Sequence, residues 1–188
     1  MKSAKRTVLL CGGSLSGAIK NPRNREVFVN YFSGRKILVY LFARKREKWS
    51  AAMGEMELAV ASLDLKIELQ LAQTDRQVRD GQLAAADAVL VLGGDEMQFF
   101  EEVSCQELAR VLDKPFVGAA SAGVNVFSSY FYSNDHKEVR KGAGLLPMKT
   151  ICHFNNTSLP KLSELEKFSP HDRLLPLRED QIEILEFE

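Results

Sequence analysis

The sequence lacks the features that mark several protein classes. Its three cysteines, Cys11, Cys105 and Cys152, form no C-x-x-C pair and are odd in number, which argues against a disulfide framework. With 25 basic and 25 acidic residues, the chain has no basic excess to bind nucleic-acid phosphates. No apolar run reaches membrane-spanning length, and the short run before Gly12 is no signal peptide. We therefore expect a soluble cytoplasmic protein with no nucleic-acid or membrane partner.

Nucleotide-binding fingerprints are missing as well. An expected strand, Thr7–Cys11, is followed by the glycine-rich turn Gly12-Gly13-Ser14-Leu15-Ser16-Gly17, which could cradle a phosphate. The turn matches neither the G-x-G-x-x-G fingerprint nor a Walker loop with its lysine. A tight turn at the carboxyl edge of a sheet is the favoured interpretation, and we expect no cofactor and no metal.

The chain does contain a regular alternation of apolar runs and helical periodicities. This rhythm predicts an α/β fold, a three-layer sandwich with a mainly parallel sheet and helices on both faces. Residues 1–188 show no repeat or linker and fit a single domain. The expected strands are Thr7–Cys11, Lys36–Phe42, Leu65–Leu71, Ala88–Leu92, a run from Phe116, and Lys149–Cys152; the expected helices are Glu26–Phe32, Trp49–Leu63, Asp75–Ala85, Glu96–Leu112 and Leu159–Phe168. At the C-terminus, Arg173–Leu177 and Gln181–Phe187 are expected to form a closing hairpin.

The stretch from Pro115 to Val126 carries the strongest chemical signal. Its apolar start turns into small residues around Ser121, with Ala119 two positions before and Gly123 two positions after. This is close to the G-x-S-x-G nucleophile elbow, in which a strained strand-to-helix turn exposes the serine hydroxyl. The N–H groups at the start of the following helix favour developing negative charge. An ordinary tight strand–helix junction has the same small residues, so this stretch alone leaves both interpretations open.

A serine nucleophile needs two partners, and candidates for both follow in the sequence. An imidazole must take the hydroxyl proton, and a carboxylate on its far side fixes the tautomer. His153, at the end of an expected strand, is better placed than His136 or His171, which lie in polar turns. With Asp135 as the acid, the candidates are Ser121, Asp135 and His153. A structural histidine at a strand end is the alternative.

Four stretches taken together resemble the peptidase E and cyanophycinase family of serine hydrolases, whose fold is similar to that of the class I glutamine amidotransferases. They occur in the family's order and at roughly its spacing: Val91-Leu-Gly-Gly-Asp95, Val117-Gly-Ala-Ala-Ser-Ala-Gly-Val-Asn125, Ser133-Asn-Asp135, and Gly142-Ala-Gly-Leu-Leu-Pro147 leading to Cys152-His-Phe154. Two positions depart from the pattern. Ala119 adds a methyl group where the family has glycine, and Asp95 matches cyanophycinases, where peptidase E has asparagine.

The resemblance implies roles for particular residues. Ser121 would be the nucleophile, His153 the base and Asp135 the acid. Backbone N–H groups of the Gly93-Gly94 turn and of Ala122 would form the oxyanion hole, whose donors typically contribute a hundred-fold or more to the rate.

The resemblance also implies an activity. It is that of a serine exopeptidase that cleaves short peptides, dipeptides with an N-terminal aspartate, through an acyl-enzyme. A small peptide is then the expected partner of a monomer or homodimer. A non-catalytic or ligand-sensing amidotransferase-like domain and a cyanophycinase-like β-aspartyl peptidase are the alternatives. A cysteine amidotransferase would need a cysteine in place of Ser121.

A basic run, Arg44-Lys-Arg-Glu-Lys48, follows the expected strand Lys36–Phe42. Ligands of open α/β sheets bind at the carboxyl ends of the strands, and arginine recognises carboxylates in a two-pronged geometry. Arg44 or Arg46 is therefore a candidate to bind an acidic substrate group. The alternative is that the whole run faces solvent at the start of a helix.

Overall fold

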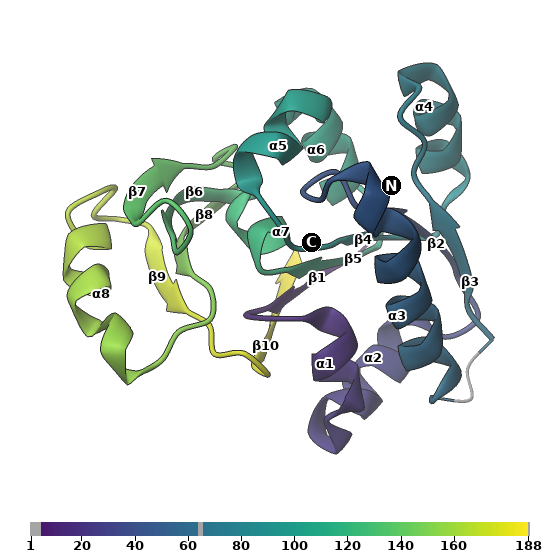
Figure 1. Cartoon of the computed structure of the whole chain (residues 1–188), viewed down its shortest axis with the longest axis horizontal. Coiled ribbons are helices and arrows are strands. Elements are labelled where there is room, and N and C mark those ends of the chain that lie inside the picture. The colour runs from purple at the N-terminus through teal and green to yellow at the C-terminus, as the bar shows by residue number, and fades with distance from the viewer. Residues whose placement is uncertain (1–4, 64–65, 188) are drawn as a thin grey trace.

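The computed structural model describes residues 5–63 and 66–187, which form two β-sheets with surrounding helices (Figure 1). The larger sheet has six strands in the order β10-β1-β5-β4-β2-β3. The five neighbouring strands β1, β5, β4, β2 and β3 run parallel to one another. Strand β10, at the edge, pairs antiparallel with β1. The strand bounds are β1 Arg6–Cys11, β2 Lys36–Tyr40, β3 Glu68–Leu71, β4 Ala88–Val91, β5 Phe116–Ala120 and β10 Ile182–Phe187.

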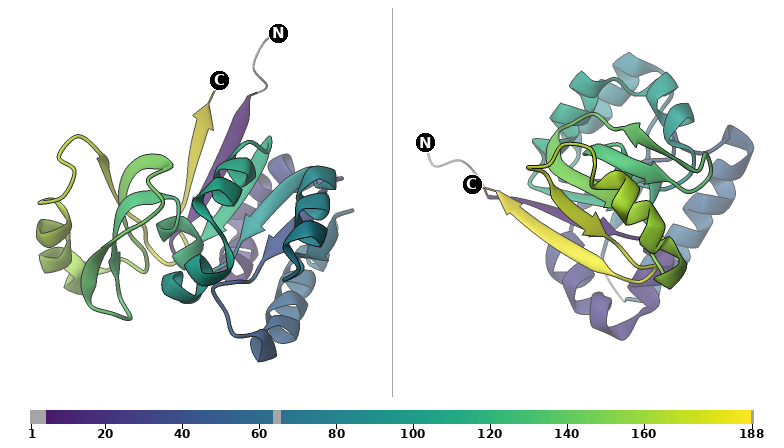
Figure 2. Two further views of the ribbon diagram at one scale, coloured as in Figure 1. Left: turned by 90° about the horizontal axis from the view of Figure 1, so that it is seen from above. Right: turned by 90° about the vertical axis from the view of Figure 1, so that its left-hand side faces the viewer.

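Helices cover both faces of this sheet, which gives the predicted three layers (Figure 2). The alternation of side chains along β1 sends Leu9 and Cys11 to one face and Val8 and Leu10 to the other. On the Leu9 face pack α1 Leu15–Lys20, α2 Pro22–Phe32 and α3 Trp49–Ala61, which follows the 3₁₀ turn η1 Arg46–Lys48; on the Val8 face pack α4 Arg76–Ala85, α5 Glu96–Glu102, α6 Cys105–Leu112 and α7 Ala122–Asn125. The α/β fold class predicted from the sequence is confirmed.

A smaller four-stranded sheet lies beside the larger one (Figure 1). Two of its strands were predicted at least in part, at Lys149–Cys152 and at Arg173–Leu177, whereas β6 and β7 were not predicted. Its order is β7-β6-β8-β9, with bounds β6 Ser128–Ser133, β7 Glu138–Lys141, β8 Leu146–Ile151 and β9 Arg173–Pro176; the turn η2 Asn156–Ser158 and helix α8 Leu159–Leu165 connect β8 to β9. Directly after β8 the chain touches the end of the larger sheet, where the N–H of His153 donates to the carbonyl of Gly12 at 2.9 Å.

The predicted closing hairpin at the C-terminus is wrong. Strand β9 pairs with β8 in the smaller sheet, whereas β10 pairs with β1 in the larger one. The connection between them crosses from sheet to sheet and is held at both ends, since Leu177 N–H donates to Ile151 O at 2.9 Å and Gly12 N–H donates to Gln181 O at 3.1 Å. Strand periodicity was readable in the sequence, but the strand partners were not.

The long helix predicted over Glu96–Leu112 is also wrong, because it is two helices. Helix α5 ends at Glu102, and the Ser104 side chain accepts a hydrogen bond from Glu107 N–H at 3.2 Å to begin α6. This serine cap provides a favourable start for a new helix. Of the predicted strand Leu65–Leu71, β3 covers Glu68–Leu71, and Leu65 lies outside the described residues. In the described part of the chain, no helix has the length and apolar composition needed to cross a bilayer.

A buried ion pair joins α4 to α6 beneath the larger sheet. Arg79 Nε donates to Glu107 Oε1 at 2.7 Å and its Nη2 donates to Oε2 at 3.0 Å, while the side chains are only 2% and 1% exposed. Tyr40 Oη donates to the same carboxylate at 3.0 Å, and desolvation by burial raises the pKa of Tyr40. Every charged atom of the pair is thus compensated by a partner.

Breaking this pair from one side is expected to destabilise the protein strongly. Glu107→Leu would leave the Arg79 guanidinium buried without a counter-charge, and such changes typically lower the free energy of unfolding by about 3–5 kcal/mol. Urea unfolding followed by circular dichroism measures the loss. Arg173→Ala, which removes an exposed partner of Glu183, is the control and should leave the free energy of unfolding nearly unchanged. Equal effects of the two substitutions would contradict the expectation.

Candidate active site

Ser121 lies in the turn between β5 and α7, at the carboxyl end of its strand. Its backbone has φ 52° and ψ −118°, a conformation that a non-glycine residue keeps only where the surroundings enforce it. One enforcing contact is the hydrogen bond from Ser121 N–H to Cys11 O at 3.0 Å. Another is the close approach of the neighbouring strand, since a methyl group at Gly123 would lie 2.1 Å from Val91 O. The elbow predicted from the sequence is therefore present, although α7 behind it is a single turn.

The alanine that replaces the family glycine causes no visible crowding. Ala119 belongs to β5, pairs in register with Leu10 and Val91, and is fully buried in the core. Its methyl group points into the apolar layer rather than into the turn. Close approach requires glycine at Gly123 and Gly93 instead, because a methyl group at Gly93 would lie 2.8 Å from Ser121 Cβ.

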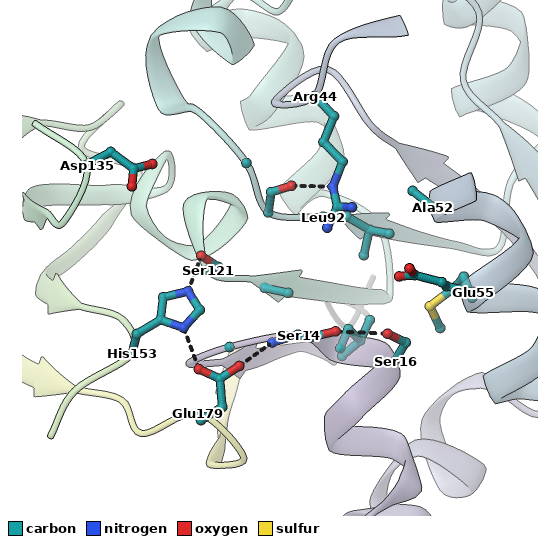
Figure 3. Close-up of a pocket in the computed structure, with 16 residues that line it drawn as sticks. Ser14, Ser16, Arg44, Ala52, Glu55, Leu92, Ser121, Asp135, His153 and Glu179 are labelled. Carbon is teal, nitrogen blue, oxygen red and sulfur yellow. Dashed lines mark hydrogen bonds and ion pairs between the residues drawn. The ribbon is translucent and has the colours of Figure 1, made fainter. Parts of the chain in front are cut away.

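A chain of hydrogen bonds runs from the serine hydroxyl to a carboxylate (Figure 3). Ser121 Oγ lies 2.8 Å from His153 Nε2, and His153 Nδ1 lies 2.5 Å from Glu179 Oε2. An ionised carboxylate can only accept, so the proton on this side belongs to Nδ1 and Nε2 remains free to accept from the hydroxyl. The other oxygen, Glu179 Oε1, accepts from Ser14 N–H at 3.3 Å and fixes the carboxylate.

The prediction that Asp135 lies on the far nitrogen of His153 is wrong, because Glu179 lies there. Asp135 is exposed in the turn after β6 and lies apart from the imidazole (Figure 3). The ring nitrogen Nδ1 faces the connection between β9 and β10, which carries Glu179, rather than the end of β6. Asn134, next to Asp135, anchors that turn by donating to Cys152 O at 2.8 Å. Asp135 still lines the same pocket as Ser121.

The glycine-rich turn after β1 makes room for the loop that carries Glu179. A methyl group at Gly12 would lie 2.1 Å from Arg178 O, and one at Gly13 would lie 2.2 Å from Glu179 Oε1. These two glycines thus serve the close approach of another segment, which agrees with the tight turn favoured from the sequence. Glu179 was missed because its link to His153 depends on the crossing between the two sheets. The only indication in the sequence was the pair Gly12-Gly13, which matches no phosphate-binding fingerprint and therefore suggests that another segment packs closely there.

The backbone groups predicted for an oxyanion hole lie around the serine. Gly93 and Gly94 line the pocket with Ser121, and Ala122 is the first residue of α7. Within the described residues, neither Gly94 N–H nor Ala122 N–H has a hydrogen-bond partner. The turn needs glycine because a methyl group at Gly94 would lie 2.0 Å from Ala43 O. Free N–H groups beside a serine are suited to bind a developing oxyanion, and that role remains a prediction for these three residues.

The pocket in front of Ser121 has a volume of about 290 Å³, room for a small ligand. Arg44 lines it, and its Nε donates to Gly93 O at 2.8 Å, which directs the guanidinium into the pocket (Figure 3). Arg46 does not line this pocket; it is exposed and lies 3.9 Å from Glu102. The two arginines are therefore separated, and only Arg44 is placed to meet a ligand at Ser121.

The cysteines near the elbow are poor nucleophiles. Burial raises the pKa of Cys11 to about 11 and that of Cys152 well above its ordinary value. Both thiols are thus protonated near neutral pH, and the thiol form is unreactive. Among the residues that the structure describes, no three His, Cys, Asp or Glu side chains gather as a metal site. In this pocket the Ser121 hydroxyl is instead hydrogen-bonded to the His153 imidazole, a group of the kind that can activate a serine.

A serine at a strand–helix elbow, backed by a hydrogen-bonded histidine and carboxylate on an α/β sheet, is the arrangement of hydrolases with a serine nucleophile. The family model of peptidase family S51 matches residues 7–185. The chain belongs to this family, and membership supports a peptidase. The resemblance to peptidase E stated from the sequence is confirmed.

Solved structures that are similar to the chain include the following two. One is the "Putative Peptidase E Protein" of Listeria monocytogenes EGD-e, with a TM-score of 0.66 and 16% identity, over 98% of this chain and 99% of that one. The other is a peptidase from an acI-B1 Actinobacterium, with a TM-score of 0.71 and 14% identity, over 97% of this chain and 84% of that one. No curated protein sequence matches the chain. At these identities the structural similarity establishes the fold.

Proposed function

We propose that the chain is a serine exopeptidase that hydrolyses short peptides, chiefly dipeptides with an N-terminal aspartate. The observation that carries this proposal is the continuous chain of hydrogen bonds from Ser121 Oγ through His153 to Glu179. Family membership supports a peptidase, and the strained elbow supports serine as its nucleophile. In this proposal Glu179 takes the role of the acid, for which Asp135 was the candidate predicted from the sequence.

In this mechanism Ser121 Oγ attacks the scissile carbonyl carbon while His153 Nε2 takes the hydroxyl proton. Glu179 holds the imidazole in the required tautomer and stabilises the imidazolium that forms. The N–H groups of Gly94 and Ala122 bind the oxyanion of the tetrahedral intermediate. The imidazolium then donates the proton to the departing amine. Ser121 remains bonded to the acyl group as an acyl-enzyme. A water molecule, deprotonated by the same imidazole, hydrolyses that ester and regenerates Ser121.

The charges in the pocket support an acidic N-terminal residue as the substrate group. Arg44 uses Nε for Gly93 O, and within the described chain its two Nη atoms have no hydrogen-bond or ion-pair partner. They are free to bind a carboxylate with two parallel bonds. Glu55 and Asp135 line the same pocket and provide negative charge for the free ammonium group of a dipeptide. A volume of about 290 Å³ fits one side chain rather than a long peptide.

A panel of Asp-X, Glu-X, Leu-X, β-aspartyl-X and N-acetyl-Asp-X substrates tests the proposal. We expect hydrolysis of Asp-X by the wild type and little of Leu-X or the acetylated peptide. Arg44→Ala should raise KM for Asp-X by about 10- to 100-fold, in line with the 1.5–3 kcal/mol of a charged hydrogen bond. Arg46→Ala is the matched control and should change KM less than two-fold.

Several outcomes would count against the proposal. Unchanged kinetics in Arg44→Ala, or a preference for apolar N-terminal residues, would exclude the role of Arg44. Faster cleavage of β-aspartyl-X than of Asp-X would favour the cyanophycinase-like alternative. No hydrolysis of any member of the panel would favour a non-catalytic domain.

A further inference from the structure

Asn125, the last residue of α7, is buried beneath the elbow with both of its polar atoms engaged. Its Nδ2 donates to Glu96 Oε1 at 2.7 Å, and its Oδ1 accepts from Thr150 Oγ1 at 2.9 Å and from Cys152 Sγ at 3.5 Å. None of these four residues is more than 5% exposed. The amide of α7 is therefore joined to α5 and to the end of β8 by direct hydrogen bonds.

Each of these elements carries one part of the candidate site. Glu96 begins α5 two residues after Gly94, which belongs to the oxyanion turn. Asn125 lies in the helical turn that begins directly after Ser121. Thr150 belongs to β8, which leads through Cys152 to His153. One amide group is thus bonded to the three segments from which the oxyanion donors, the nucleophile and the base project.

A further contact connects this network to the strained backbone. The single S–H of Cys152 is shared between Asn125 Oδ1 and Ser121 O, which lies 3.4 Å from Sγ, and Ser128 Oγ donates to Asn125 O at 2.7 Å. A backbone conformation such as that of Ser121 persists only where several contacts determine it together. The side chain at position 125 must both donate and accept, a combination that an asparagine amide offers and an apolar residue of similar size does not.

We propose that Asn125 and Glu96 are positioning residues, whose hydrogen bond holds the Gly93-Gly94 turn at a fixed distance from the Ser121 elbow and so shapes the oxyanion hole. This inference rests on the proposed serine-hydrolase function. Neither residue lines the pocket, so both act through the backbone they hold. A misplacement of about 1 Å can reduce the rate of a catalysed step by about 100-fold, which sets the upper end of the expected effect.

The test compares Asn125→Leu with Glu96→Gln. The leucine removes the amide, and kcat for Asp-X should fall about 30- to 100-fold with KM changed less than two-fold. The glutamine keeps an acceptor for Asn125 Nδ2, and its kcat should stay within two-fold of wild type. A peptide boronic acid, which forms a tetrahedral adduct on the serine, should bind Asn125→Leu weaker by the same factor as kcat.

Two controls separate positioning from a general loss of packing. Tyr40→Phe also deletes a buried hydrogen bond, to Glu107, and should lower the melting temperature without lowering kcat. Thr150→Val removes a single donor to Asn125 and serves in place of Asn125→Leu if the leucine variant does not fold. A smaller kcat loss of about three- to ten-fold is then expected.

A readout without turnover keeps this inference distinct from the proposed function. In ¹H–¹⁵N spectra of the free protein, Asn125→Leu, or Thr150→Val in its place, should shift the amide signals of Gly93, Gly94 and Ala122, while Tyr40→Phe should leave them in place. A wild type that cleaves nothing and binds no boronic acid would refute the proposed function, and these amide shifts would still test the pair. Unchanged amide signals, or a folded Asn125→Leu variant with wild-type kcat, would overturn the positioning role.

Discussion

Ser121→Ala is expected to lower kcat for Asp-X by about 10⁶-fold, to the limit of detection. Removing the serine of a hydrogen-bonded serine–histidine pair has an effect of this order in serine hydrolases, because the remaining groups act only with the nucleophile. His153 would still lie 2.5 Å from Glu179, but its Nε2 would have no hydroxyl to deprotonate. The loss is measured as the rate of Asp-X hydrolysis, which is monitored through the amino group of X that the reaction releases.

The controls for this substitution are labelling and stability. An active-site-directed fluorophosphonate should label wild type on Ser121 and leave Ser121→Ala unlabelled. Within the described residues, the hydrogen bond of the hydroxyl is the one to His153 at 2.8 Å, and alanine keeps the Cβ, so the melting temperature should stay nearly unchanged. Residual hydrolysis above one per cent, in protein free of other peptidases, would contradict the mechanism.

Glu179→Gln is expected to lower kcat by about 10⁴-fold, whereas Asp135→Asn should leave the hydrogen-bonded chain intact. A carboxylate accepts from His153 Nδ1–H, but the glutamine amide can donate to Nδ1. The ring proton then moves to Nε2, which can no longer accept the proton of Ser121. The corresponding change from carboxylate to amide in a serine protease triad reduces kcat by about this amount.

The comparison of these two variants distinguishes the carboxylate that the structure places on the imidazole from the one that the sequence favoured. Asp135→Asn removes a charge that lines the pocket, so a change in KM is compatible with a substrate-binding role. A larger kcat loss in Asp135→Asn than in Glu179→Gln would reject Glu179 as the acid. Both variants should melt near the wild-type temperature, because both side chains are exposed.

The sequence was informative wherever neighbouring residues decide the structure. Apolar runs and helical spacings predicted the alternating strands and helices, and the small residues around Ser121 predicted the strand–helix elbow. The chain has only three histidines, so the candidates for the base were few. Ser121 Oγ and His153 Nε2 lie 2.8 Å apart, as the predicted pairing of these two residues requires.

The sequence by itself thus determined the fold class, the elbow and the serine–histidine pair, which depend on local conformation and strand order. The tertiary structure decided which carboxylate reaches the imidazole and which arginine reaches the pocket. Asp135 is nearer to His153 in sequence, yet the crossing from β9 to β10 brings Glu179 to Nδ1, where Gly12 and Gly13 leave room for it. The Arg44 side chain extends into the pocket because its Nε donates to Gly93 O at 2.8 Å. Such contacts join segments far apart in the chain, and no local pattern encodes them.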